Sequence, residues 1–216
     1  MAFVVFDVDG TLVDSRATIV ACAREAFRVA GLEPPAEEAI RRIVGLSLEP
    51  AIAELLGEPD PVLARRIAAC YRDAYLGLAA AGHVDPLFAG ARELLEQLDA
   101  DGHLLGVASG KSLAGVRRVL AAHGLEHLFV TLQTADFHPS KPHPAMLEAA
   151  MAEAGAGPAE TFLVGDTVFD IEMARHAGAH AVGVSWGNHP PEELEAAGAL
   201  RVLDRFPELL ELVPLR

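Results

Sequence analysis

Residues 3–15, Phe-Val-Val-Phe-Asp-Val-Asp-Gly-Thr-Leu-Val-Asp-Ser, decide how the rest of the chain is interpreted. Four apolar residues end abruptly at two aspartates and a glycine, which is typical of a buried strand that opens into a loop. Similar apolar runs, each followed by small, polar or acidic residues, recur at 104–108, 129–132, 161–164 and 181–184. The sequence therefore predicts five strands with loops at their carboxyl ends.

Helical patterns separate these strands. Apolar residues recur at helical spacing from Phe88 to Leu98 and again from Leu113 to Leu120. Strands that alternate with helices pair in parallel, and the helices then cover both faces of the sheet. The predicted fold class is α/β, with a Rossmann-like parallel sheet as its core.

One segment, residues 15–82, departs from this alternation. It is rich in Ala, Leu, Ile, Arg and Glu at helical spacing, and no part of it has the pattern of a strand. We therefore expect a small all-α domain inserted after the first strand. Residues 1–14 and 83–216 would form the α/β core domain, and residues 15–82 the inserted helical domain.

Composition limits the possible partners. Of 216 residues, 51% are hydrophobic and 22% are charged, as in a folded protein. The 31 acidic and 17 basic residues give a net charge of −14, which argues against nucleic acids and anionic membranes as partners. The apolar runs are too short to span a bilayer, and no signal peptide is recognisable. Two cysteines, Cys22 and Cys70, form no disulfide framework, so a cytoplasmic location is expected.

Candidate functional residues follow four of the predicted strands. Because ligands of open parallel sheets bind at the carboxyl ends of the strands, these residues should lie at one edge. They are Asp7 and Asp9 after the first strand, Ser109 and Gly110 after the second, Lys141 in the loop after the third, and Asp166 and Asp170 after the fourth.

These residue types suit phosphoryl transfer, which needs a nucleophile, a proton donor for the leaving oxygen and positive charge around the transferred group. Asp7 could attack phosphorus and form an aspartyl-phosphate, and Asp9 could protonate the leaving alkoxide. Ser109 and the Gly110 amide could donate hydrogen bonds to phosphoryl oxygens, and Lys141 supplies a fixed cation.

A divalent cation would complete the charge balance. The four aspartates at this edge bring more negative charge than Lys141 offsets, so a phosphate ester would be repelled. The carboxylates of Asp7 and Asp166, with the main-chain carbonyl of Asp9 and with Asp170 nearby, are oxygen ligands of the kind that Mg²⁺ prefers. The sequence therefore predicts a Mg²⁺ site.

Residues 5–15 closely resemble the first motif of the haloacid dehalogenase-like hydrolase superfamily. The resemblance continues in order through Ser109, through Lys141 in Lys-Pro-His-Pro, and through residues 165–170, Gly-Asp-Thr-Val-Phe-Asp. It implies a Mg²⁺-dependent phosphatase that forms an aspartyl-phosphate and acts on a small phosphorylated metabolite.

The inserted helices resemble the cap of the phosphoglycolate phosphatase-like branch, whose cap loop is matched by Gly45-Leu46-Ser47. This implies 2-phosphoglycolate as the substrate. Arg16 is the cap cation expected nearest the site. The sequence leaves open whether the chain is a monomer or a homodimer.

Other functions remain open. On the same fold, a sugar phosphomutase of the β-phosphoglucomutase type or a pyrophosphatase is possible. Such mutases often carry an arginine shortly after the cap loop, and Ser47-Leu48-Glu49 offers none. A haloacid dehalogenase has no use for Asp9. A phosphorylation-controlled or catalytically silent binding module is the non-enzymatic alternative.

Several residues also have purely structural interpretations. Asp166 suits a helix N-cap, and Asp170 suits the first turn of a helix. Lys111 is interpreted as a solvated side chain beside the Ser109 loop, and His138 and His143 as surface histidines rather than zinc ligands. The arginines of the inserted segment are interpreted as a solvated helical face; they are Arg41, Arg42, Arg65 and Arg66. A loop is the default for Trp186, Asn188 and His189.

Overall fold

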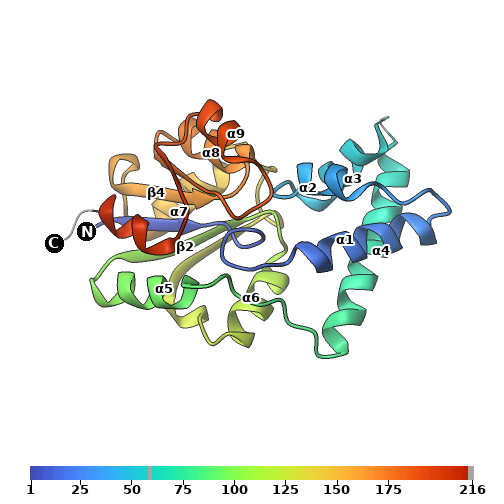
Figure 1. Cartoon of the computed structure of the whole chain (residues 1–216), viewed down its shortest axis with the longest axis horizontal. Helices are drawn as coiled ribbons and strands as arrows, with labels where there is room; N and C mark the ends of the chain where they lie inside the picture. The colour runs from blue at the N-terminus through green and yellow to red at the C-terminus, as the bar shows by residue number, and fades with distance from the viewer. Residues whose placement is uncertain (58–59, 214–216) are drawn as a thin grey trace.

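A computed structural model of the chain describes residues 1–57 and 60–213. Its centre is a six-stranded parallel sheet in the order β3-β2-β1-β4-β5-β6 (Figure 1). The strands are β1 (Phe3–Phe6), β2 (Leu104–Ser109), β3 (Phe129–Thr134), β4 (Thr161–Gly165), β5 (His180–Val184) and β6 (Arg201–Leu203). The predicted α/β fold is confirmed, and so are the five predicted strands. The sixth, β6, pairs with β5 at the edge of the sheet and was not predicted.

Helices cover both faces of the sheet. Side chains alternate along β1, so that Val4 and Phe6 join one apolar cluster while Phe3 and Val5 join another. On the first face lie α5 (Ala91–Ala100), α6 (Leu113–Ala122) and the short 3₁₀ helix η3 (Phe206–Glu211). On the second lie α7 (Ala145–Ala154), α8 (Val168–His176) and α9 (Pro191–Ala197). Burial on both sides explains why the strands are continuous apolar runs. Two further 3₁₀ turns, η1 (Glu126–Leu128) and η2 (Pro158–Glu160), precede β3 and β4.

Strand register brings the predicted site residues to one edge. Phe6, the last residue of β1, pairs with Val107 of β2 and with Val164 of β4. Asp7 continues the strand by donating its backbone N–H to the Val164 carbonyl at 2.9 Å. The chain therefore leaves all three central strands at nearly the same level.

Four helices lie between β1 and α5. They are α1 (Arg16–Val29), α2 (Glu37–Arg42), α3 (Leu48–Leu56) and α4 (Pro61–Ala80). In the described part of this segment there is no strand, and the helices bury two small apolar clusters of their own. Figure 1 shows them gathered at one end of the molecule, beyond the carboxyl ends of the strands.

The two connections to this helical segment run side by side. The backbone N–H of Asp14 donates to the Pro86 carbonyl at 2.9 Å, and that of Phe88 donates to the Leu12 carbonyl at 3.0 Å. Val13 and Leu87 form an antiparallel bridge. The chain thus enters and leaves the helical segment at one place.

Of the two arginines of α2, Arg42 is exposed, as the sequence suggested, whereas Arg41 is half-buried. Arg41 donates to the backbone carbonyl of Asn188 at 2.9 Å, and Arg42 forms an ion pair with Glu193 of α9. Both side chains therefore hold α2 against the loops of the sheet domain. Arg65 and Arg66 are exposed, as expected.

The remaining expectations concern cysteines and membranes. Cys22 is buried and Cys70 is half-buried, and both are free thiols. Among residues 1–57 and 60–213, the helices are too short or too polar to cross a membrane.

Candidate active site

Lys141 is the centre of a buried charge cluster at the carboxyl edge of the sheet. Its Nζ lies 2.9 Å from Asp7 Oδ1 and 2.6 Å from Asp170 Oδ1, and all three side chains are fully or almost fully buried. Burial alone would lower the pKa of Lys141, but the carboxylates of Asp170 and Asp7 outweigh it and raise the pKa. The lysine therefore remains a fixed cation beside Asp7.

Asp170 orients this lysine and lies in the first turn of α8. Its Oδ2 accepts hydrogen bonds from the backbone N–H of Thr167 at 3.1 Å and from the Thr167 hydroxyl at 2.7 Å. Thr167 is the N-cap of α8 and forms a capping box with Asp170, so the alternative role of Asp166 as N-cap is wrong. Asp170 occupies the first turn, as predicted, and also holds Lys141.

Asp166 is held in place from two sides. Its Oδ1 accepts from the Thr11 hydroxyl at 2.9 Å, and its Oδ2 accepts from the backbone N–H and the side-chain amide of Asn188, both at 2.8 Å. A glycine is needed at position 10, because a Cβ there would overlap the carboxylate of Asp166. The sequence analysis does not name Thr11 and assigns Asn188 only to a loop, although both fix a site carboxylate.

Asp7 is the residue with an unsatisfied carboxylate. Its Oδ2 is buried and accepts no hydrogen bond, while its Oδ1 faces Lys141. Burial, opposed by Lys141 and reinforced by the neighbouring aspartates, raises the pKa of Asp7 to about 7. Burial also raises the pKa of Asp166 to about 6, with Asp170 as the next cause.

Carboxylate oxygens of Asp7, Asp166 and Asp170 lie within 4.8 Å of one another. In the described part of the chain they form the only group of His, Cys, Asp or Glu side chains arranged to hold a metal ion. Three hard oxygen donors and one unsatisfied buried oxygen fit Mg²⁺, which is bound by few carboxylates. The carboxylate of Asp9 is not in this group.

Asp9 is paired instead with Lys111. Their Oδ2 and Nζ atoms lie 3.0 Å apart, and the Lys111 ammonium lies 4.8 Å from the centre of the Tyr75 ring of α4. The interpretation of Lys111 as a solvated side chain is therefore wrong: only 11% of its side chain is exposed. The other oxygen of Asp9, Oδ1, is buried without a hydrogen-bond partner.

The loop Gly45-Leu46-Ser47 lies directly against the Ser109–Gly110 turn. A Cβ at Gly110 would lie 2.6 Å from the Leu46 carbonyl oxygen and 2.7 Å from that of Gly45, so only glycine allows this approach. The backbone N–H of Ser47 donates to Ser140 Oγ at 2.8 Å, one residue before Lys141. The structure thus brings the predicted cap loop and the predicted phosphate-binding turn together.

Arg16 lies elsewhere. Its guanidinium donates to the Gly187 carbonyl at 2.7 Å, and it is not among the described residues that line the cavity at Asp7. His143 is exposed, whereas His138 is half-buried, donates from Nε2 to Gln133 Oε1 at 2.7 Å, and lines the cavity.

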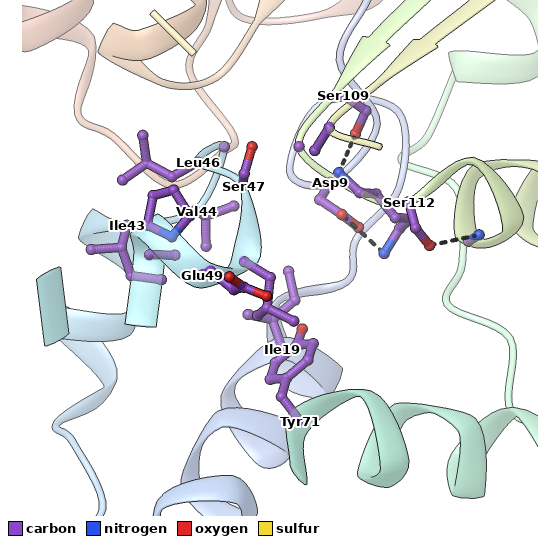
Figure 2. Close-up of a pocket in the computed structure, with 18 of the residues that line it drawn as sticks. Asp9, Ile19, Ile43, Val44, Leu46, Ser47, Glu49, Tyr71, Ser109 and Ser112 are labelled. Carbon is purple, nitrogen blue, oxygen red and sulfur yellow. Dashed lines mark hydrogen bonds and ion pairs between the residues drawn. The ribbon is translucent and has the colours of Figure 1, made fainter. Parts of the chain in front are cut away.

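A cavity of about 670 Å³ opens from Asp7 and Asp9 towards the helical segment. Figure 2 shows Asp9, Ser109 and Ser112 on one side of it, with Ile43, Val44 and Leu46 opposite and Ile19 and Tyr71 on the side of α1 and α4. Asp7 and Asp9 therefore line the same cavity as residues of the helical segment.

This chain is similar to known hydrolases and phosphatases. The profile of the haloacid dehalogenase-like hydrolases matches residues 4–184. A protein of Dickeya dadantii named "Probable phosphatase IndB" is 38% identical over 96% of this chain and 91% of its own length. A phosphoglycolate phosphatase of Vibrio parahaemolyticus is 30% identical over 97% of this chain and 95% of its own.

Solved structures give the same result. A hydrolase from Pseudomonas syringae superposes with a TM-score of 0.87 at 31% identity, covering 98% of this chain and 97% of that one. The family profile spans most of the chain, including Asp7, Ser109, Lys141 and Asp166. This chain belongs to the haloacid dehalogenase-like hydrolase family.

Proposed function

We propose that this hydrolase is a Mg²⁺-dependent phosphatase of small phosphomonoesters. The observation that carries the proposal is the Asp7 carboxylate, which lines the cavity with one buried oxygen unsatisfied and the other 2.9 Å from Lys141. A nucleophile beside a fixed cation, with a second carboxylate two residues away, is what phosphoryl transfer through a covalent intermediate requires.

In the first step, Asp7 attacks phosphorus, and the bond from phosphorus to the ester oxygen breaks as an aspartyl-phosphate forms. Asp9 gives its proton to the departing alkoxide, which leaves as an alcohol. In the second step, Asp9 removes a proton from water, and the resulting hydroxide displaces Asp7 and releases inorganic phosphate.

The remaining residues stabilise the transferred group. The Ser109 hydroxyl and the Gly110 N–H donate to phosphoryl oxygens, and Lys141 offsets the charge that develops on them. Lys111 holds the Asp9 carboxylate in place and adds a second cation to the site. Asp7 and Asp166, with Asp170 and the Asp9 carbonyl nearby, would hold Mg²⁺, which would supply the positive charge that a phosphate dianion needs in an acidic site.

The names of relatives such as the Vibrio phosphatase support 2-phosphoglycolate as one candidate substrate. A sugar phosphomutase is the second candidate function on the same fold. Such an enzyme needs a cation that binds a second phosphate, and Arg72 of α4 lines the cavity but is paired with Glu49. The free thiols of Cys22 and Cys70 support a cytoplasmic location.

The test is hydrolysis of p-nitrophenyl phosphate with Mg²⁺ and with chelator, by the wild type and by Asp7→Asn. Asp73→Asn, at an exposed position of α4, is the matched control. We expect Mg²⁺-dependent turnover that Asp7→Asn abolishes and Asp73→Asn retains. Absence of turnover in the wild type would favour a silent binding module, and transfer of phosphate to a sugar phosphate rather than to water would identify a mutase.

A further inference from the structure

The wall of the cavity that faces the reactive carboxylates is apolar. It is built from α1, α3 and the segment that joins α2 to α3, and its aliphatic side chains are those of Ile19, Ile43, Val44, Leu46, Ile52 and Leu55. Figure 2 shows the cavity between Asp9, Ser109 and Ser112 on one side and this wall on the other, so the leaving group of a phosphate ester bound at Asp7 and Asp9 is expected to extend towards the wall.

Two of the cations in the described lining of the cavity are paired with carboxylates. Lys111 is paired with Asp9 at 3.0 Å, and Arg72 lies 3.4 Å from Glu49. Arg118 is an exposed residue whose guanidinium lies 5.8 Å from the centre of the Tyr75 ring. Glu49 and Asp136 add negative charge to the same lining. A carboxylate on the leaving group would therefore be repelled by Glu49 and Asp136, and the exposed Arg118 is the lining cation that is not already paired with a carboxylate.

The size of the cavity also exceeds what a two-carbon acid needs. About 670 Å³ lies within the range of roughly 300–1,000 Å³ that accommodates drug-sized ligands. Glycolate would leave most of the apolar wall without contact. An alkyl or aryl leaving group would cover that wall and leave the existing ion pairs intact.

We infer that the site prefers phosphomonoesters with an uncharged, apolar leaving group of several carbons over 2-phosphoglycolate. This inference rests on the proposed phosphatase function and names its substrate class. Ile43 and Leu46, both half-buried at the cavity wall, would contact the leaving group and determine this preference.

The experiment compares kcat/KM for ethyl, butyl and hexyl phosphate and for 2-phosphoglycolate, all with Mg²⁺. The three alkyl esters share a primary alkoxide leaving group, so differences among them report binding of the chain. We expect kcat/KM to rise by up to about fourfold for each added methylene. We expect 2-phosphoglycolate to fall at least about tenfold below hexyl phosphate.

Variants of the cavity wall test which residues determine the preference for apolar leaving groups. Ile43→Gln and Leu46→Gln should each lower kcat/KM for hexyl phosphate about tenfold more than for ethyl phosphate, because one apolar contact is lost. Leu32→Gln, at an exposed position of the helical segment outside the cavity lining, should retain the wild-type chain-length dependence. Thermal unfolding checks that each variant is folded, and the wild-type series alone decides the inference if one is not.

The outcomes are distinguishable. A flat chain-length series, or a higher kcat/KM for 2-phosphoglycolate, overturns the inference while the phosphatase function stands. Absence of hydrolysis of every ester, including p-nitrophenyl phosphate, overturns the proposed function and the inference with it.

Discussion

Replacing Asp7 by Asn should stabilise the metal-free protein at neutral and alkaline pH while it removes the nucleophile. The wild-type carboxylate is buried, and one of its oxygens has no hydrogen-bond partner. Asn has nearly the same shape and no charge to desolvate. Lys141 keeps its second partner, Asp170, at 2.6 Å.

The sign and magnitude follow from the raised pKa. Asp7 titrates near 7 in the folded protein and near 4 in an unfolded chain. Below about pH 4 both states are protonated, so Asp7 has no effect on stability. As the pH rises to 7 the unfolded chain loses its proton first, and the folded state is destabilised by up to about 4 kcal/mol. Asp7→Asn lacks this penalty, so its advantage should grow by roughly 2–3 kcal/mol between pH 5 and pH 8.

The assay is urea unfolding in the presence of EDTA at pH 5 and pH 8, with Asp73→Asn as the control. Added Mg²⁺ should narrow the gap at pH 8, because the ion binds folded wild type more tightly than the variant. A variant that is less stable than the wild type at pH 8, or a gap that is equal at the two pH values, would refute the reasoning.

Three further predictions test other contacts. Lys141→Met leaves two buried carboxylates without a cation and should lower the free energy of unfolding by about 3–5 kcal/mol at pH 8; an unchanged urea midpoint would contradict the buried ion pairs. Gly110→Ala should reduce kcat/KM by about 10²-fold, since its methyl group displaces the 45–47 loop, whereas Gly77→Ala, with open space around its Cβ, should be neutral or stabilise α4 by up to about 1 kcal/mol. A double-mutant cycle on Arg42 and Glu193 should give a coupling of about 0.2–1 kcal/mol, as expected for an exposed pair, and zero coupling would show that the pair does not hold α2.

The fold could be predicted because β1, β2, β4 and β5 are buried on both faces and therefore leave continuous apolar runs in the sequence. The sequence does not predict β6, and the cause is physical. It has three residues, Arg201 to Leu203, and hydrogen-bonds to one neighbour only, so little apolar sequence is needed to form it. Edge strands of this kind carry a weak signal.

The site could be predicted where residues follow strand ends and not where partners come from distant segments. Asp7, Ser109 and Asp166 lie at the sheet edge because topology places them there. The pairing of Lys111 with Asp9 joins residues far apart in the chain, and no local pattern records it. The sequence offered one indication of this pairing, which is that Lys111 directly follows the predicted phosphate-binding turn at Ser109 and Gly110.

The cap residues show the same limit. Gly45-Leu46-Ser47 was found through a resemblance, and the contact with Gly110 gives it a physical reason. Arg16 was chosen by its position in the chain, and its hydrogen bond with the Gly187 carbonyl directs it away from the cavity. Side-chain direction depends on packing that sequence spacing does not encode.

The adjacent connections at Asp14 and Pro86 allow the helical segment to be exchanged as a unit. Because both ends of the helical segment meet at one hydrogen-bonded point, a segment of another length or architecture can be spliced between them without altering strand order. Residues 15–85 could therefore be exchanged for those of a relative, and comparing the hydrolysis of several phosphate esters by the chimera and by the parent would test whether this segment determines the substrate range.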